Sequence, residues 1–254
     1  MPEHNTSRTV STADTLFEVI GTLRDLEGST VTEVANELDL AKSTVHAYLA
    51  SLEQKEYVVK DGNEYELGLK FYDHGMDILN RMDLVEVARP IMKQTAEESG
   101  ELVWLFVEEH GRAVYLERAE GDRAVQTSGR RGLRTYLHLL ASGKAMLAEM
   151  PETRVEQIID QHGLPQQTAE SVTSKEKLYD RLEVVRNRGY AYNRGEEVPG
   201  VYAIGAPIMN DGDVQAGISV AGPAARFNDE SYDTRMRNTI IEAANTIELN
   251  LKYQ

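Results

Sequence analysis

The segment Ser142-Gly143-Lys144 has the composition of a helix start that can hold an anion. It stands where a loop is predicted to turn into a helix, and the first turn of a helix offers free backbone N–H groups and the positive end of a dipole. A carboxylate would suit such a position. The segment is not a Walker A loop, because that motif needs glycine at the position of His138. The alternative is a plain N-cap serine, with Gly143 placed for close packing.

A second group of polar side chains stands at the start of a predicted helix within residues 41–58, which follows a turn at 39–42 and has Ser43 and Thr44 in its first turn. Val45, Leu49 and Leu52 form one apolar face of this helix, whereas the opposite face is small and uncharged. Small side chains let a helix approach a DNA groove closely, and the polar ones can reach phosphates and base edges. The residues predicted to contact DNA, including those of the hairpin that follows, are Lys42, Ser43, Thr44, His46, Ala47, Lys55, Lys60 and Asn63.

The sequence contains no set of residues typical of catalysis or of metal binding. It has no G-x-S-x-G or H-E-x-x-H motif, no cysteine, and no close metal-ligand spacing among its six histidines. We therefore expect no catalytic residue, no metal and no cofactor. One alternative is an enzyme built on the C-terminal part with an N-terminal targeting module, which turnover of a bound small molecule would favour.

The first 68 residues must position the side chains that contact DNA. Apolar spacing predicts a helix over residues 14–26, and Thr30 with Glu33 has the spacing of a capping box at the start of a second helix. After the third helix, Asp61-Gly62 lies between alternating residues and predicts a hairpin. Helices followed by a two-stranded wing are typical of a winged helix-turn-helix, whose last helix enters the major groove. A three-helix protein-interaction module with the same core is the alternative.

Residues 69–84 are predicted to link this domain to a second one. A helix over residues 69–82 carries an apolar stripe that we expect to pack against its own domain and a second subunit, with packing wholly within the chain as the alternative. The stripe consists of Leu69, Tyr72, Met76 and Leu79. A further helix over residues 84–98 contains Pro90, which predicts a kink or a new start there.

Residues 85–254 are predicted to form a separate α+β domain, with an antiparallel sheet covered by helices. Alternating patterns predict strands over 102–107, 113–118, 123–128, 190–194, 201–209 and 214–222. Apolar spacing predicts helices over about 142–162, over 175–188 and from Asp229 onward.

By their order and spacing, three stretches of the chain resemble the IclR family of transcriptional regulators. They are AKSTVHAYLASLEQKEYV at 41–58, LLASGKAMLAEM at 139–150 and RNRGYAYNRGEEVPGVYAIGAPIMNDGDVQAGISVAGPAARF at 186–227. The resemblance covers essentially the whole chain. It implies a winged helix-turn-helix, a linker helix that dimerises it, and a GAF-like domain whose small-molecule effector, often an organic acid, alters binding to a double-stranded DNA operator. It also implies a homodimer or a dimer of dimers, that is, a homotetramer.

The resemblance also implies an effector site. Ala141 and Ser142 match positions whose backbone amides receive an effector carboxylate, and Arg194 and Glu196 are neighbours of matched positions. The full set of matched and neighbouring residues is Ala141, Ser142, Asn193, Arg194, Glu196, Ala203, Ser219 and Ala221.

Three of these residues differ from well-known members of the family. Asn193 stands where Asp is frequent, Ala203 lacks a polar or thiol side chain, and Ala221 replaces a frequent Ser. Removing donors and acceptors changes the polar groups that a ligand must satisfy. We therefore expect an organic or sugar acid, without carrying over the small keto acids of the family.

Two further features favour a structural interpretation. Arg130, Arg131 and Arg134 stand just ahead of the predicted site, and we expect a solvated loop paired with surface carboxylates rather than an anion site. Trp104 lies in an apolar strand, and we expect it in the core rather than as a platform for a ligand.

The composition of the 254 residues suggests where the protein works. Its net charge is −15, and its basic residues are 18 Arg and only nine Lys. An acidic, lysine-poor surface retains water and ions in concentrated salt, so we expect a salt-loving host, with an ordinary acidic mesophilic protein as the alternative. No apolar run reaches the roughly 18 residues that span a membrane, and no signal peptide is recognisable, so we expect a cytoplasmic protein.

Overall fold

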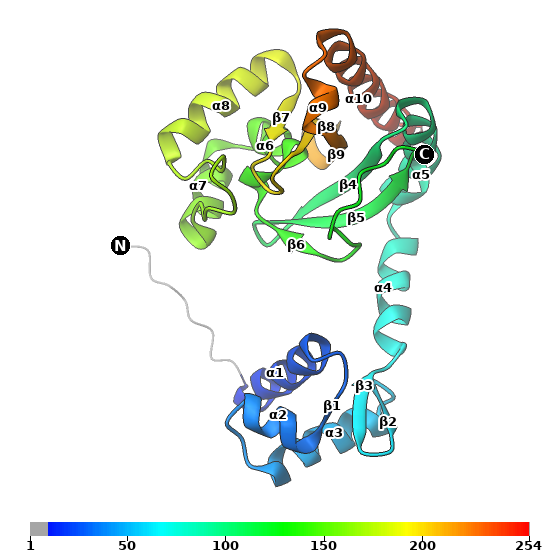
Figure 1. The fold of residues 1–254 in the computed structure, drawn as a ribbon, viewed down its shortest axis with the longest axis vertical. Coiled ribbons are helices and arrows are strands. Elements are labelled where there is room, and N and C mark those ends of the chain that lie inside the picture. The colour runs from blue at the N-terminus through cyan, green and yellow to red at the C-terminus, as the bar shows by residue number, and fades with distance from the viewer. Residues whose placement is uncertain (1–9, 254) are drawn as a thin grey trace. The chain divides into compact units, whose positions relative to one another are not determined.

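The computed structural model describes residues 10–253, which divide between Arg81 and Met82 into two compact units (Figure 1). The first unit contains helices α1 (Ser11–Asp25), α2 (Val31–Glu37), α3 (Lys42–Gln54) and α4 (Lys70–Asn80), with strands β1 (Ser29–Thr30), β2 (Val58–Asp61) and β3 (Glu64–Leu67). The strands form an antiparallel sheet in the order β1-β3-β2. Three helices and this wing confirm the predicted winged helix-turn-helix.

Local interactions explain why the first unit adopts this order of elements. The Thr30 side chain accepts a hydrogen bond from the Glu33 backbone N–H, and the Glu33 carboxylate accepts one from the Thr30 N–H, which completes the predicted capping box of α2. Gly62 has a φ of +58° in the tight turn between β2 and β3. The inner faces of the helices supply the core, which includes Val19, Leu23, Val34, Val45 and Leu49.

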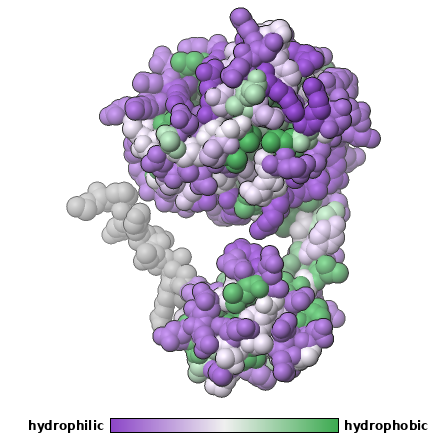
Figure 2. Space-filling view, viewed as in Figure 1, coloured by the Kyte–Doolittle hydropathy of each residue, from purple (hydrophilic) through white to green (hydrophobic). Residues whose placement is uncertain are grey.

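Helix α4 contacts the first unit chiefly around Tyr57 and leaves much of its apolar surface open. Its Lys70 ammonium donates a hydrogen bond of 3.1 Å to the Lys55 carbonyl and pairs with Glu56 at 3.4 Å. Tyr57 Oη lies 2.7 Å from His74 Nε2, and the ring centroids of Tyr57 and Phe71 are 5.0 Å apart. No residue of α4 is buried. Figure 2 shows hydrophobic surface along this part of the chain, where Tyr72 and Ile78 are exposed. The helix contacts its own domain through Phe71 and His74, not through the predicted stripe, of which Leu69 and Tyr72 are exposed. Packing of the stripe against a second subunit stays a prediction.

The second unit is a six-stranded antiparallel sheet with helices on both faces. Its strands are β4 (Leu102–Glu109), β5 (Arg112–Glu120), β6 (Arg134–Thr135), β7 (Ala191–Arg194), β8 (Val201–Asn210) and β9 (Asp213–Pro223). Its helices are α5 (Asp83–Ser99), η1 (Leu137–Leu139), α6 (Ala141–Glu149), α7 (Glu152–His162), α8 (Lys175–Arg188), α9 (Ala224–Phe227) and α10 (Glu230–Leu251). The strand order is β6-β5-β4-β9-β8-β7, and this arrangement confirms the predicted α+β fold.

The two faces of this sheet carry different helices. Helices α5 and α10 pack on each other and on one face, whereas α6, α7 and α8 lie on the other (Figure 1). Because side chains alternate along a strand, Trp104 and Phe106 of β4 face the α6 side. The intervening residues Val103 and Leu105 are fully buried on the opposite face.

Two predicted elements of the second unit are wrong in detail, and of the kink or new start predicted at Pro90 only the new start is contradicted. Residues 123–128 form no strand. Ala124 and Val125 pack against the core, but the segment does not pair with a neighbouring strand. The helix predicted over 142–162 is two helices, because Pro151 has an extended ψ of 139° and separates α6 from α7. No new helix starts at Pro90. Helix α5 continues through it, with buried residues packed on both sides of the proline.

Candidate functional site

A cavity of about 300 Å³ lies between the sheet and the start of α6. Its lining comes from all six strands of the sheet, from the start of α6, and from the loops that precede β6, α6, α8 and β8. The lining includes Trp104, Phe106, Tyr115, Leu140, Ala141, Asn193, Glu197, Ala203, Ser219 and Ala221. These residues are far apart in the sequence, so the sheet is what brings them together.

One wall of the cavity is aromatic. The ring centroids of Trp104 and Tyr115 are 4.8 Å apart, those of Phe106 and Tyr115 are 4.5 Å apart, and both pairs meet edge to face. Trp104 is 4% exposed and belongs to the core, as expected, but it also lines the cavity. Since Trp104 is the only tryptophan of the chain, its fluorescence will report on occupancy of this cavity.

Another part of the lining combines small side chains of β8 and β9 with the start of α6. Ala141, Ala203 and Ala221 pack together there. Leu140 is the N-cap residue and has no side-chain group to bond the first amides of the helix. The first N–H groups of a helix have no partner within it and lie at the positive end of the helix dipole. This wall can therefore receive a carboxylate at Ala141.

The alternative interpretation of Ser142-Gly143-Lys144, an N-cap serine with Gly143 placed for close packing, is only half right. Ser142 is not an N-cap residue, because α6 already begins at Ala141. Gly143 does serve close packing, since a Cβ atom there would lie 2.1 Å from the Leu137 carbonyl oxygen. Strand β8 also approaches closely, because a Cβ atom at Gly205 would lie 2.3 Å from the Ser142 nitrogen.

The cavity also contains a carboxyl group that sequence reasoning missed. Tyr115 Oη donates a hydrogen bond of 2.6 Å to Glu197 Oε1. Burial raises the pKa of Glu197, against the opposing effects of hydrogen bonds from Tyr115 and Thr135 and of the charge of Lys144. A buried acid of this kind holds its proton more tightly than one in water. A ligand in the cavity therefore meets a hydrogen-bonding group with reduced negative charge.

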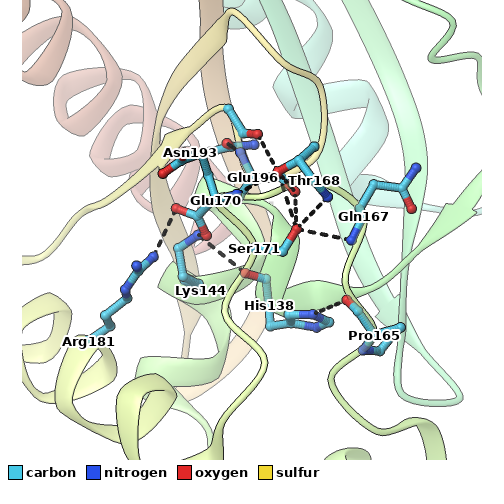
Figure 3. A network of polar contacts seen from close by, with 11 residues as sticks. His138, Lys144, Pro165, Gln167, Thr168, Glu170, Ser171, Arg181, Asn193 and Glu196 are labelled. Atoms are coloured by element: carbon cyan, nitrogen blue, oxygen red, sulfur yellow. Dashed lines mark hydrogen bonds and ion pairs between the residues drawn. The ribbon is translucent and has the colours of Figure 1, made fainter.

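Glu196, the neighbour of Glu197, faces away from the cavity into a buried network (Figure 3). Its carboxylate pairs with Lys144 at 2.5 Å and with Arg181 at 3.0 Å. Its backbone N–H donates to Asn193 Oδ1 at 2.8 Å, and its carbonyl accepts from the Ser171 hydroxyl at 2.7 Å. This network fixes the segment after β7, and Asn193 joins the network to the cavity.

His138 lies beside this network, and its carbonyl accepts a hydrogen bond from Lys144 (Figure 3). Its Nε2 donates a hydrogen bond of 3.1 Å to the Pro165 carbonyl, with the proton on Nε2 because a carbonyl only accepts. Burial, reinforced by the charge of Lys144 and opposed by the Pro165 hydrogen bond, lowers the pKa of His138 from 6.5 to about 4.

The structure brings together most of the predicted effector residues. Those that line the cavity are Ala141, Asn193, Ala203, Ser219 and Ala221. Ser142, Arg194 and Glu196 do not line it. Ser142 is buried and its hydroxyl has no hydrogen-bond partner among the described residues, whereas Arg194 is exposed and lies over the Tyr192 ring.

The expected pairing of the arginine-rich loop with surface carboxylates is only partly right. Arg134 pairs with the exposed Glu109, whereas Arg131 pairs with Glu117, whose side chain is only 6% exposed. Arg134 also lines the cavity. The residues that sequence reasoning missed are chiefly Tyr115, Thr135, Gln167 and Glu197. No local motif marks them, because each belongs to a different segment.

In the first unit, the predicted DNA-contacting residues are all exposed. Val45, Leu49 and Leu52 are buried under α3, so its outer face presents Lys42, Ser43, Thr44, His46 and Ala47. Lys55 follows the helix, Lys60 lies in β2 with its ammonium 5.2 Å from the Tyr65 ring centre, and Asn63 is in the hairpin turn. Residues 40–60, which include α3 and most of β2, offer polar donors with a net charge of +1, whereas Asp61, Glu64 and Glu66 make the rest of the wing acidic.

A helix-turn-helix unit joined to a unit with an internal cavity is the plan of a ligand-responsive DNA-binding protein. Residues 12–62 match the IclR helix-turn-helix domain, and residues 76–249 match the C-terminal domain of the bacterial transcriptional regulator IclR. The chain belongs to the IclR family of transcriptional regulators, as its sequence resemblance predicted.

Relatives with assigned names extend over nearly the whole chain. The probable HTH-type transcriptional regulator ArcR of Halobacterium salinarum is 32% identical over 250 residues, which cover 96% of this chain and 95% of the relative. The HTH-type transcriptional regulator BhcR of Paracoccus denitrificans is 31% identical over 241 residues, which cover 94% of this chain and 86% of the relative.

Solved structures show the same fold. The crystal structure of a Thermotoga maritima IclR has a TM-score of 0.79 at 27% identity, covering 95% of this chain and 98% of that one. An IclR homologue from Microbacterium hydrocarbonoxydans, complexed with 4-hydroxybenzoate, has a TM-score of 0.78 at 24% identity, covering 94% of this chain and all of that one. None of the helices among residues 10–253 is long and apolar enough to cross a membrane.

Proposed function

We propose that this regulator binds an operator through α3 and the wing, and that a small organic acid in the cavity alters this binding. The observation that carries the proposal is the uncapped start of α6, which opens into a cavity walled by aromatic and small side chains. The wall at Ala141 suits the acid group, and the aromatic wall suits an apolar body.

The contacts of the effector follow from the lining. The amide of Ala141 receives the carboxylate, with Ser142 behind it in the same helical turn. Asn193 and Ser219 supply side-chain hydrogen bonds, whereas Ala203 and Ala221 leave room for the body of the ligand. Arg194 and Glu196 lie outside the cavity, so the proposed contacts do not include them. Sugar acids and aromatic acids both belong in a ligand screen, since the homologue from Microbacterium hydrocarbonoxydans is complexed with 4-hydroxybenzoate.

The effector site can be tested through Trp104, the only tryptophan. Titration with organic, sugar and aromatic acids should change its fluorescence and alter operator affinity for at least one of them. Ala141→Pro removes the N–H that faces the cavity but fits a first helical position, because Leu140 already has the extended ψ of 149° that proline requires of its predecessor. Ala141→Val is the matched control, since it adds similar bulk and keeps the N–H. We expect the proline variant to lose binding of the acid and the valine variant to retain more of this binding. Equal affinity in both variants would refute the proposed carboxylate site.

The DNA-binding surface can be tested by single alanine substitutions of Lys42, Ser43, Thr44 and His46. Loss of a side chain that contacts a base should cost about 1 to 3 kcal/mol of operator binding. Ser51→Ala is the control on the same helix, because its hydroxyl bonds only to the Ala47 carbonyl. Wild-type operator affinity in all four variants, with the fold intact, would contradict the assignment of these side chains to the DNA-binding surface.

We also propose that the protein acts in the cytoplasm of a salt-loving host, without catalytic activity of its own. The acidic, lysine-poor composition supports the host, and one relative comes from Halobacterium salinarum. The exposed apolar surface of α4, with Leu69, Tyr72 and Ile78, supports self-association into a dimer or a dimer of dimers. Light scattering of the wild type and of a Tyr72→Glu variant, both at high salt, tests this assembly. An unchanged mass in the variant would argue against α4 as the contact.

A further inference from the structure

A second pocket, of about 490 Å³, lies on the surface between α8 and β7. Arg181 and Arg188 reach it from α8, whereas Tyr192 and Arg194 reach it from β7. The buried pair of Lys144 and Glu196 also lines it. We call it the arginine–tyrosine pocket. Nothing in the proposed effector site uses it, because the effector cavity shares none of these residues.

Two positive charges in this pocket lack a carboxylate partner. Arg188 and Arg194 form no ion pair among residues 10–253, although acidic residues outnumber basic ones by 42 to 27 in the chain. Each guanidinium carbon lies 5.0 Å from the centre of the Tyr192 ring, so the two lie at most about 10 Å apart. Burial lowers the pKa of Arg188. Tyr190 and Tyr192 oppose this shift, and repulsion from Arg194 and Arg237 adds to it.

The carboxylates of the pocket do not balance these two charges. Glu196 is engaged by Lys144 and Arg181, and the Tyr192 hydroxyl donates to Asp233, which itself pairs with Arg237. Glu170 and Asp180 are the other acids of the lining, and both are exposed to solvent. An anion held between Arg188 and Arg194 would therefore supply the negative charge that no ion pair of the pocket gives them.

We propose that the arginine–tyrosine pocket binds a small dianion, either a phosphoryl group or a dicarboxylate, between Arg188 and Arg194. The planar guanidinium fork recognises both kinds of anion through paired N–H donors. The Tyr192 ring holds the two arginines in place by cation–π contacts.

The position of β7 couples this pocket to the effector cavity. Tyr192 and Arg194 face the pocket, whereas Asn193, between them, lines the cavity. Asn193 in turn accepts the hydrogen bond from the Glu196 backbone, and the next residue, Glu197, lines the cavity. A shift of Arg194 or Glu196 on anion binding therefore moves two residues of the effector site. This coupling rests on the proposed effector function, whereas the anion site itself does not.

Isothermal titration calorimetry of the full chain with inorganic phosphate, and separately with succinate, tests the site. The measurements are made at one fixed KCl concentration and with matched chloride additions as blanks. We expect saturable binding that weakens at least about tenfold in a double variant, Arg188→Gln with Arg194→Gln. The matched control is Arg130→Gln with Arg235→Gln, which removes two exposed arginine charges outside the pocket. Equal losses in the two double variants, or no heat from either anion at millimolar concentration, would overturn the site.

Two further measurements separate this site from the effector cavity. Ala221→Phe fills the cavity, so it should abolish the Trp104 response to an effector and leave phosphate binding intact. If the two sites are coupled, phosphate will change the effector affinity, and the effector will change the phosphate affinity by the same factor. Phosphate binding without this reciprocal change would overturn the coupling alone. Phosphate binding with no effector found would contradict only the proposed effector function.

Discussion

Lys144 Nζ lies 2.5 Å from Glu196 Oε2, and this contact ties α6 to the segment that follows β7. The two side chains are 2% and 4% exposed, so both charges lie in an environment with little water. Burial lowers the pKa of Lys144, and the charge of Glu196 opposes this shift. Each charge is therefore tolerated because the other is present.

Removing one charge of this pair should lower the free energy of unfolding far more than replacing both residues by apolar ones. Glu196→Gln leaves Lys144 buried without a countercharge, and we expect a loss of about 3 to 5 kcal/mol in the free energy of unfolding. The double variant Lys144→Met with Glu196→Leu removes both charges and should recover most of that loss. Urea unfolding at fixed salt measures both variants. A double variant as unstable as the single one would show that the pair itself, and not the unpaired charge, decides the stability.

His138 should make the protein less stable in acid. Its pKa is lowered from 6.5 to about 4, so between these values the unfolded chain binds a proton that the folded chain does not. The contribution of His138 to the free energy of unfolding is fully present above the pKa of the unfolded state. It is lost as the pH falls toward the pKa of the folded state, by at most roughly 3 kcal/mol. His138→Gln keeps a donor for the Pro165 carbonyl and cannot titrate. We expect unfolding free energies of the two proteins to converge as the pH falls through this window, and parallel curves would contradict the assignment.

Glu197 should have the opposite pH dependence. Because its pKa is raised, the folded state keeps a proton that the unfolded state has released, and stability falls as the pH rises through the folded pKa. Glu197→Gln preserves an acceptor for Tyr115 and abolishes the titration. The variant should therefore gain thermal stability relative to wild type as the pH rises from the ordinary carboxyl pKa of 4.5 through the raised pKa of the folded state. A Tm difference that stays constant over this range would show that Glu197 titrates normally.

Operator binding should depend little on salt. Residues 1–80 contain 15 acidic and six basic residues, a net charge of −9, whereas residues 40–60 have a net charge of +1. Ordinary DNA-binding proteins lose about 0.9 in log K per neutralised phosphate for each tenfold rise in salt, and three lysines can neutralise few phosphates. Salt also screens the repulsion between the remaining carboxylates and the DNA.

The salt prediction is checked by measuring operator affinity between roughly 0.2 and 3 M KCl. We expect a flat or rising affinity for as long as the fold is intact. Substitution of Lys42 by Gln should make the slope still less negative. A steep fall, equivalent to about six or more neutralised phosphates, would contradict the charge argument.

The first unit was predictable because its signals are local. The capping box joins residues three apart, Thr30 and Glu33, and the hairpin turn depends on Gly62 and its neighbours. Such interactions depend little on the rest of the chain. The same holds for α3, whose buried and exposed faces follow from its own 3.6-residue period.

The second unit was predictable only in outline, because distant residues determine its details. Val125 lies in an alternating stretch, and only the structure shows that it packs on the core without pairing as a strand. Lys144 and Glu196 are 52 residues apart, and no local pattern announces that they meet. The resemblance found Asn193 and Ser219 in the cavity lining, but Tyr115 and Glu197 carry no motif and needed the sheet to bring them there.

The alternation along β4 separates two kinds of evolutionary constraint. Trp104 faces the cavity, whereas Val103 and Leu105 are buried on the face that carries α5 and α10. On β9, Ser219 and Ala221 line the cavity, whereas Val220 between them belongs to the other face. Selection for a new effector can therefore exchange cavity residues one at a time without changing the residues that pack against α5 and α10. A single scaffold can diversify into regulators of unrelated metabolites by this route.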